Sequence, residues 1–220
     1  MTDPGPRTEP GRRLHALAIE LAAMAQNGLN YATDRYETAR YRRLQAVTAE
    51  LLAMLSDGDP AEFRAALAAE AGHATPKVDV RGALFDDAGR VLLVREKRDG
   101  RWTLPGGWAD PLDPPARAVE REVAEEAGLT VRAVRLAAVH DGSKHNGHGA
   151  SPWHIYKLFF VVERTDPAEE PVAGLDEETT GVGFFAPDQL PDLSTRRTTA
   201  DQLHLMWTYH ADPALPTAFD

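Results

Sequence analysis

The sequence predicts an α+β protein, in which a small all-helical unit is followed by a mixed sheet packed between helices. Two observations support this fold class. Apolar residues recur three or four positions apart over residues 13–72, which is the spacing of amphipathic helices. From residue 77 onward, short alternating or continuously apolar runs, typical of strands, are interleaved with two helical segments. The 220 residues are enough for one good core and a smaller second domain.

The first helix is expected after a disordered tail. Residues 1–12 are polar and rich in proline, with little to bury. The helix that follows should end at Asn27-Gly28, because these residue types commonly terminate helices. Its apolar positions are Leu14, Leu17, Ala18, Leu21 and Ala25.

Two further helices complete the predicted helical unit. The second should begin at Asp34, with Glu37 as its capping-box partner. The third should begin at Asp59-Pro60, an N-cap followed by a first-turn proline. The apolar face of the second helix is expected to consist of Tyr36, Leu44, Val47, Leu51 and Leu55. Because short helices must bury their apolar faces, this unit should pack as a domain against another surface.

The second domain is expected over residues 77–212, with 213–220 as a tail. Turn residues at 86–89 separate the first two strands. Helices are expected at about 115–127 and 198–210. Strands are expected at 78–85, 91–94, 102–104, and near 130–140, 154–163 and 181–186.

Composition excludes several classes of protein. The chain has no cysteine, so it has neither disulfides nor a cysteine-based zinc site. No apolar run reaches the ~20 residues of a membrane span, and residues 1–10 contain no apolar signal core, so we expect a cytoplasmic protein without membrane contact. A net charge of −10 makes nucleic acid an improbable partner.

The helix at 115–127 carries the most informative residues. Glu122, Glu125 and Glu126 fall on one face, because positions i, i+3 and i+4 of a helix lie together. Three like charges in one turn are unfavourable unless a cation lies between them. Oxygen ligands suit hard divalent ions, and Mg²⁺ or Mn²⁺ is expected before Ca²⁺ if phosphates complete the coordination.

The segment from Gly107 to Leu129 resembles the signature of the Nudix hydrolases, G-x5-E-x7-R-E-U-x-E-E-x-G-U, in which U is a bulky apolar residue. The spacing matches without a gap, and the Leu104–Gly107 loop stands at the right offset. The one departure is Asp113, which stands where the family has its first Glu. The matching residues are Gly107, Arg121, Glu122, Val123, Glu125, Glu126, Gly128 and Leu129.

A second resemblance covers nearly the whole chain. Some Nudix proteins have a helical N-terminal domain joined by a link similar to Thr75–Arg81. This resemblance implies a Nudix α/β/α sandwich over 77–212, and a domain at 13–72 that forms a homodimer interface or a lid. It also implies a substrate of the type nucleoside diphosphate linked to X, such as ADP-ribose or CDP-choline, cleaved to a nucleoside monophosphate.

The resemblance implies roles for the residues of the signature. Glu122, Glu125 and Glu126, with the carbonyl of Gly107, would bind the Mg²⁺ or Mn²⁺ ions that activate water for attack on phosphorus. Arg121 would orient Glu122 and support the helix rather than touch the substrate.

The general base and the role of Asp113 stay open at this stage. Glu122 is one candidate for the base, and Glu178, in the acidic run 176–178, is an alternative as base or added ligand; a solvated loop explains that run equally well. Asp113-Pro114 is interpreted as a structural N-cap with activity retained, although a weakened site is the alternative.

Four residues are candidates for substrate binding. Trp108 could stack on a base, and Lys144 or His145 in a Gly-rich loop could meet a phosphate. Arg197 could bind an anion at the start of the last helix. The alternatives are core packing for the tryptophan and solvated surface for the other three.

Two other functions are weighed against the hydrolase. A non-catalytic Nudix-fold sensor of ADP-ribose-like ligands is favoured only by Asp113, since a pure binder has no need of three clustered acids. An RNA 5′ pyrophosphohydrolase is disfavoured by the acidic charge and the absence of a basic stripe.

Overall fold

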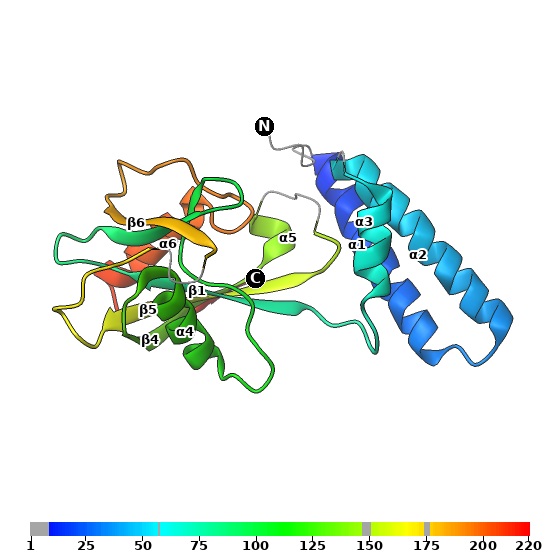
Figure 1. Cartoon of the computed structure of the whole chain (residues 1–220), viewed down its shortest axis with the longest axis horizontal. Helices are drawn as coiled ribbons and strands as arrows, with labels where there is room; N and C mark the ends of the chain where they lie inside the picture. Colours follow the sequence, from blue (N-terminus) through cyan, green and yellow to red (C-terminus); the bar gives the residue numbers. More distant parts are fainter. Residues whose placement is uncertain (1–8, 57, 147–150, 174–176) are drawn as a thin grey trace. The chain divides into compact units, whose positions relative to one another are not determined.

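The computed structural model describes residues 9–56, 58–146, 151–173 and 177–220. The chain divides into two compact units (Figure 1). One comprises Met1–Lys77 with Gly147–His154, and the other comprises Val78–Asn146 with Ile155–Asp220. None of the helices in these described ranges has the length and apolar character that a membrane span requires.

In the part of the first unit that the structure describes, three helices surround a small apolar core. They are α1 (Glu9–Tyr31), α2 (Arg35–Ser56) and α3 (Pro60–Ala68). The predicted N-caps Asp34 and Asp59 are confirmed, whereas the Glu37 side chain, expected to complete a capping box, lies 3.9 Å from Arg40. Asp34 accepts hydrogen bonds from the N–H groups of the next turn at 2.7 and 2.9 Å, and Asp59 accepts one at 2.8 Å. The core consists of Ala18, Ala22, Ala49, Leu52, Ala53, Phe63 and Leu67.

The predicted limits of the first helix are wrong. Helix α1 begins at Glu9, inside the expected tail, of which residues 1–8 lie outside the described part of the chain. It also continues through Gly28 to Tyr31. A Cβ atom at Gly28 would lie 2.2 Å from Cδ1 of Tyr41 on α2. This glycine therefore permits close contact between two helices and does not end one.

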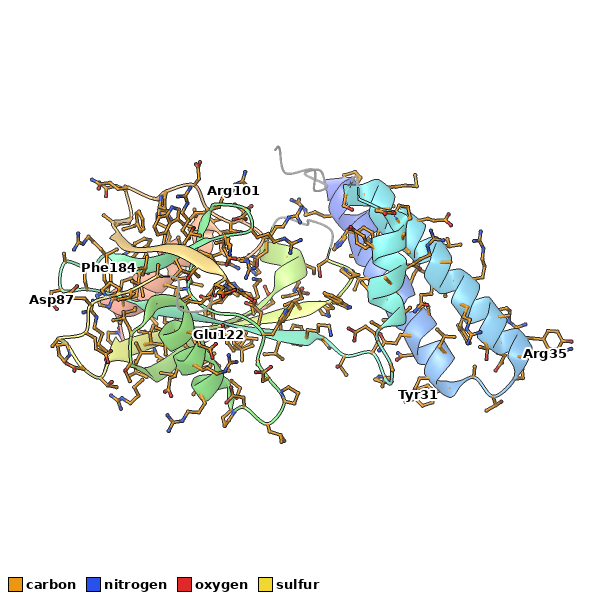
Figure 2. The ribbon with its side chains drawn as sticks, in the orientation of Figure 1. Tyr31, Arg35, Asp87, Arg101, Glu122 and Phe184 are labelled. Atoms are coloured by element: carbon orange, nitrogen blue, oxygen red, sulfur yellow. The ribbon has the colours of Figure 1, made fainter. Side chains whose placement is uncertain are left out.

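The predicted apolar face of α2 is confirmed only in part. Leu51 and Leu55 pack against the core as expected. The buried residues of α2 are Thr48, Ala49, Leu52, Ala53 and Ser56, which are mostly small. Tyr36 and Val47, expected to be buried, are 64% and 40% exposed. Small side chains on this face let the helices approach closely, and Tyr36 and Val47 lie outside the contact. Figure 2 shows Tyr31 and Arg35 at the tip where α1 passes into α2.

The described residues of the second unit form two sheets. One has the strand order β1-β5-β4-β7 and the other β3-β2-β6. Strand β4 is antiparallel to β5 and parallel to β7, so the first sheet is mixed. The strands are β1 (Lys77–Leu84), β2 (Val91–Glu96), β3 (Trp102–Thr103), β4 (Val131–Asp141), β5 (Ile155–Arg164), β6 (Thr179–Phe185) and β7 (Ala218–Phe219).

Alternate residues of the strands are buried on opposite sides. In β2, Leu92 and Val94 join the core that contains α4 (Pro115–Ala127), whereas Val91 and Leu93 join the core that contains α6 (Ala200–Ala211). Both faces are therefore covered by helices, which confirms the predicted α/β/α sandwich. A short additional helix, α5 (Gly142–His145), follows β4.

The predicted C-terminal tail is instead part of this unit. Ala218 and Phe219 form β7 and pair with Ala138 and Val139 of β4. The carboxylate of Asp220 accepts a hydrogen bond of 2.6 Å from the N–H of Asp141. A two-residue strand has no periodicity that a sequence pattern can reveal, so its contacts with the rest of the chain alone define it.

Candidate active site

The glycine-rich loop after β3 is fixed along strand β1. The N–H groups of Val80 and Gly82 donate to the carbonyls of Gly107 and Pro105 at 2.8 and 2.9 Å. Gly106 has a φ of 143°, and a Cβ atom there would lie 2.0 Å from the Val80 oxygen. Only glycine fits this position, and the loop therefore stays next to helix α4.

Helix α4 docks on the same strand through its apolar side. A Cβ atom at Gly82 would lie 2.9 Å from Cγ2 of Val123, so the missing side chain lets the helix approach β1 closely. The helix ends at Gly128, whose φ of 68° is the left-handed C-cap conformation. The residues opposite the apolar side include the three glutamates of the signature.

The three glutamates differ in burial. Glu126 is 4% exposed and accepts a hydrogen bond of 2.8 Å from the Gly106 N–H. The side chain of Glu122, labelled in Figure 2, is 13% exposed, and its Oε2 lies 2.9 Å from where a Cβ of Gly107 would be. The side chain of Glu125 is 49% exposed. The exposure of the three carboxylates therefore increases from Glu126 at the loop, through Glu122, to Glu125 at the surface.

Burial leaves the inner carboxylates poorly solvated. Desolvation raises the pKa of Glu126 to about 8, although the charge of Arg81 and the Gly106 hydrogen bond oppose it. Desolvation also raises the pKa of Glu122. Two buried acids that lack enough compensating positive charge are suited to a divalent cation, which would favour their ionised forms. Across the described ranges, no three His, Asp or Glu side chains are already arranged to hold a metal ion.

Arg121 lies among the acids of α4 and the preceding loop. Its guanidinium is 3.0 Å from Glu122 and 2.9 Å from Glu125. Two aspartates of the loop, Asp110 and Asp113, lie 3.5 and 3.3 Å from it. Arg121 thus contacts carboxylates of both the helix and the loop.

The predicted capping role of Asp113 is wrong. Helix α4 begins at Pro115, its N-cap is Pro114, and no side chain caps it. The residue before a proline is driven toward extended backbone angles, so Pro114 takes the N-cap position and displaces Asp113 from it. The Asp113 carboxylate instead accepts a hydrogen bond of 3.3 Å from Arg121. Asp113 therefore supports the arginine of the signature.

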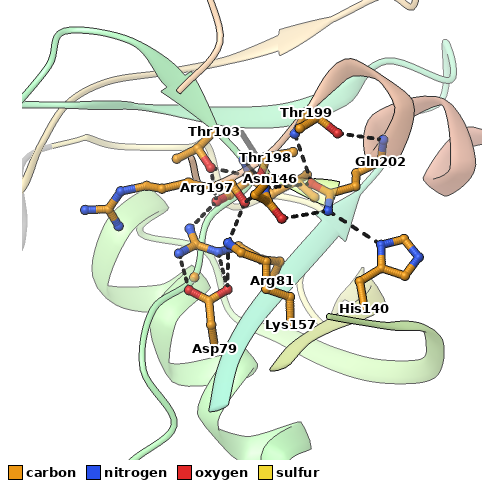
Figure 3. A network of polar contacts seen from close by, with 12 residues as sticks. Asp79, Arg81, Thr103, His140, Asn146, Lys157, Arg197, Thr198, Thr199 and Gln202 are labelled. Atoms are coloured by element: carbon orange, nitrogen blue, oxygen red, sulfur yellow. Dashed lines mark hydrogen bonds and ion pairs between the residues drawn. The ribbon is translucent and has the colours of Figure 1, made fainter. Parts of the chain in front are cut away.

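A buried network of charged residues, which the sequence reasoning missed, adjoins this loop (Figure 3). Arg81 is 1% exposed, donates to both carboxylate oxygens of Asp79 at 2.9 and 2.6 Å, and donates to the carbonyl of Leu104 at 3.1 Å. Lys157 of β5 lies 3.5 Å from Asp79. One sequence feature could have revealed this network. Asp79 and Arg81 are charged residues two positions apart in a largely apolar strand, so both lie on the same buried face.

Two further acids, Glu96 and Glu178, belong to the end of β2 and the segment beside it. Glu96 is 3% exposed, and its Oε2 lies 3.0 Å from Arg197. The backbone carbonyl of Glu178 accepts a hydrogen bond of 2.8 Å from the backbone N–H of Lys97. Burial raises the pKa of Glu96, and the charge of Glu178 adds to this effect. Of the predicted acidic run, Asp176 lies outside the described residues.

The other predicted substrate residues are dispersed. Trp108 is 46% exposed and adjoins Gly107 in the loop. His145 lies on α5, where its Nε2 is 2.8 Å from Asp220 and its ring stacks on His140 at 3.9 Å. Lys144 is its exposed neighbour on the same helix.

Comparison with known proteins identifies the family. A model of the NUDIX domain matches residues 75–206, which contain the loop, helix α4 and both sheets except β7. The chain belongs to the Nudix family. A second model, described as a UDP-X-like N-terminal oligomerisation domain, matches residues 12–67. The helical unit thus matches a domain that is known from other Nudix proteins.

Several Nudix relatives resemble much of the chain. A putative ADP-ribose pyrophosphatase, YjhB, of Bacillus subtilis (strain 168) is 39% identical over 203 residues, covering 92% of this chain and 95% of that protein. An ADP-ribose pyrophosphatase structure from Streptococcus suis is 37% identical with a TM-score of 0.59, covering 66% of this chain and all of that one. A UDP-X diphosphatase structure is 28% identical with the same TM-score, covering 96% and 99%.

The chain is therefore a Nudix pyrophosphohydrolase with an additional N-terminal helical region. Nudix hydrolases generally need divalent cations, and the buried acids of α4 provide the oxygen donors that such ions prefer.

Proposed function

We propose that this Nudix enzyme hydrolyses the diphosphate bond of nucleoside diphosphates linked to a second group, in a reaction that depends on Mg²⁺ or Mn²⁺. ADP-ribose is the first candidate substrate and CDP-choline the second, and the products are a nucleoside monophosphate and the phosphorylated second group. The observation that carries this proposal is the buried carboxylate of Glu126, held at the glycine-rich loop by the Gly106 N–H. The ADP-ribose-related names of two relatives support the choice of substrate.

Glu122, Glu125 and Glu126 are the residues that hold the cation in this proposal, with the carbonyl of Gly107 as a further ligand. The bound ion supplies charge neutralisation at the phosphates and lowers the pKa of a water molecule. The Gly107 carbonyl already accepts one hydrogen bond from Val80, which leaves one lone pair for this role. Arg121 orients the two outer glutamates through its contacts of 3.0 and 2.9 Å.

The general base is either Glu122 or Glu178. The Glu122 side chain is largely buried beside the loop, and its raised pKa brings it closer to the working range of a base near neutral pH. Glu178 is exposed, directly precedes β6 and interacts electrostatically with Glu96. We favour Glu178 as an added ligand or base, because this leaves Glu122 available to bind the cation.

Substrate contacts are assigned to residues around the loop. The Arg197 side chain is 32% exposed, and its guanidinium lies beside Glu96. A guanidinium in this position suits bidentate binding of a phosphate. Trp108 offers an exposed ring on which a base can stack. Lys144 and His145 are weaker candidates, because His145 already pairs with Asp220.

The helical unit is proposed to form a homodimer with a second copy. Its matching family model describes an oligomerisation domain. Its helices also expose large apolar side chains, which would be covered on association. These exposed residues are Leu14, Met24, Tyr31, Tyr36, Val47 and Met54.

The proposed activity is tested by product analysis on a panel of substrates with Mg²⁺ or Mn²⁺. The panel comprises ADP-ribose, CDP-choline, UDP-sugars, NADH, nucleoside triphosphates and 5′-triphosphorylated RNA. Metal-dependent release of a nucleoside monophosphate from ADP-ribose or CDP-choline supports the proposal. Turnover of RNA alone, or binding of ADP-ribose without turnover, would contradict it.

A further inference from the structure

Arg197 lies in a segment that has no helix or strand of its own. Residues 194–199 contain only a turn, closed by hydrogen bonds of 2.8 and 2.9 Å to the Ser194 carbonyl. The carbonyl of Arg197 accepts two further hydrogen bonds, from Nζ of Lys157 at 2.7 Å and from Nδ2 of Asn146 at 3.2 Å (Figure 3). The main chain at Arg197 is therefore fixed by side chains of other elements.

The next residue fastens the same segment to the glycine-rich loop. Oγ1 of Thr198 lies 2.9 Å from Oγ1 of Thr103 and accepts a hydrogen bond from the Leu104 N–H at 3.4 Å. Thr198 is completely buried, whereas the Arg197 side chain is one-third exposed. The segment thus has a rigid main chain and one cationic side chain that can reach a ligand.

The guanidinium of Arg197 is held at the acidic site by Glu96. The pair is 3.0 Å apart, and Glu96 is buried. Glu96 also interacts electrostatically with Glu126 and with Arg81. A phosphate group that enters this region meets a guanidinium whose carboxylate partner can be exchanged for it.

Packing alone gives no reason for a lysine at position 157. Its side chain is 5% exposed, and burying an ammonium group costs several kcal/mol that only good partners offset. Asp79 is already bound through both oxygens by Arg81, and it lies 3.5 Å from Lys157. The short hydrogen bond of Lys157 goes to the Arg197 carbonyl. A methionine would fill this space without the cost of burying a charge.

We propose that Lys157 is a positioning residue, which holds the main chain of Arg197 so that its guanidinium binds the diphosphate of the substrate. Asn146 shares this task, and Glu96 holds the guanidinium when no substrate is bound. The inference rests on the proposed function, since Arg197 is taken to contact the diphosphate. Lys157 itself touches no substrate.

The experiment is a double-mutant cycle on ligand binding, which needs no turnover. The dissociation constant of α,β-methylene-ADP, a nucleoside diphosphate with an uncleavable bridge, is measured with Mn²⁺ by calorimetry. The proteins are the wild type, Lys157→Met, Arg197→Met and the double variant. Loss of a charge-assisted contact in Arg197→Met should weaken binding about 10- to 100-fold. Lys157→Met should weaken it about 5- to 10-fold.

The decisive result is the double variant. If Lys157 acts through Arg197, the double variant binds no more than about twofold more weakly than Arg197→Met alone. Independent effects that multiply would overturn the proposal, because a purely structural defect does not need Arg197. Full affinity in Lys157→Met would overturn it as well. Lys77→Met is the control, because the Lys77 ammonium pairs with Glu70 at 2.8 Å, and it should bind as the wild type does.

A second variant covers the case in which Lys157→Met does not fold. Asn146→Leu removes the other donor to the Arg197 carbonyl, and it should show the same dependence on Arg197. Turnover separates this inference from the proposed activity. If the protein hydrolyses no substrate but shows the non-additive binding pattern, the role of Lys157 stands and the proposed activity is contradicted. If the wild type does not bind α,β-methylene-ADP, both the role of Lys157 and the proposed activity are overturned.

Discussion

The backbone N–H of Gly106 donates a hydrogen bond of 2.8 Å to the buried carboxylate of Glu126. This contact joins the glycine-rich loop to the acidic helix, and the loop is itself hydrogen-bonded to strand β1. The position of the innermost acid therefore depends on a backbone conformation that only glycine adopts without strain.

Gly106→Ala is expected to destabilise the protein severely. The new Cβ would overlap the Val80 oxygen, so the loop must move away from both β1 and Glu126. We expect a loss of more than about 3 kcal/mol in the free energy of unfolding, measured by urea denaturation. Gly89→Ala is the matched control, because Gly89 has a φ of 71° but nothing within 4 Å of the new atom. It should cost only about 1–2 kcal/mol, and equal losses would show that backbone strain, not the clash, dominates.

Asp113→Ala is expected to have a small effect on stability. Asp113 caps no helix, and its partly exposed pair with Arg121 should contribute under about 1 kcal/mol. Thr199→Ala removes the true capping box of α6 and should cost about 1–2 kcal/mol. Urea denaturation compares the two variants. A larger loss for Asp113→Ala than for Thr199→Ala would restore a structural role that the contacts do not show.

Gly28→Ala tests the packing of the helical unit. Alanine is the better helix former by about 1 kcal/mol, so propensity alone predicts a more stable α1. The clash with the ring of Tyr41 predicts the opposite, a less stable unit. Thermal unfolding followed by circular dichroism measures the outcome, and Tyr41→Ala in the same background should relieve the loss. A stabilising Gly28→Ala would mean that the two helices do not pack this closely.

Stability should rise with pH above about 8 because of Lys157. Burial lowers the pKa of Lys157 from 10.5 to about 8. Between these values the unfolded chain binds the proton and the folded one releases it, so folding becomes more favourable as pH increases. The gain is on the order of 3 kcal/mol between pH 8 and 10.5. The contribution of Lys157 is the difference in the free energy of unfolding between the wild type and Lys157→Met, measured by urea denaturation at each pH. If this difference does not change with pH, the burial of Lys157 is contradicted.

The parts of the site that the sequence predicts are local in the chain. The acidic face of α4 follows from the spacing of Glu122, Glu125 and Glu126, and the strands and helices of the sandwich follow from apolar periodicity. Asp34 and Asp59 were recognised as caps because a cap binds N–H groups only two or three residues away. Such features need no knowledge of the tertiary structure.

The features that were missed depend on contacts between distant segments. Gly28 has the sequence context of a C-cap, but the ring of Tyr41 decides its role. Lys157 lies 40 residues before Arg197, and no pattern in either segment predicts their hydrogen bond. Asp113 was misplaced by one position, because two consecutive prolines shifted the start of α4.

The central claim, that the buried acid of α4 serves metal-dependent hydrolysis, is tested most directly with Glu126→Gln. The measurement is the release of AMP from ADP-ribose in Mg²⁺ or Mn²⁺ by the wild type, by Glu126→Gln and by the exposed control Glu163→Gln. Removal of a cation ligand should lower kcat about 100-fold or more in Glu126→Gln, with a fold that circular dichroism shows to be intact, and Glu163→Gln should match the wild type. Turnover by Glu126→Gln at the wild-type rate would contradict the account.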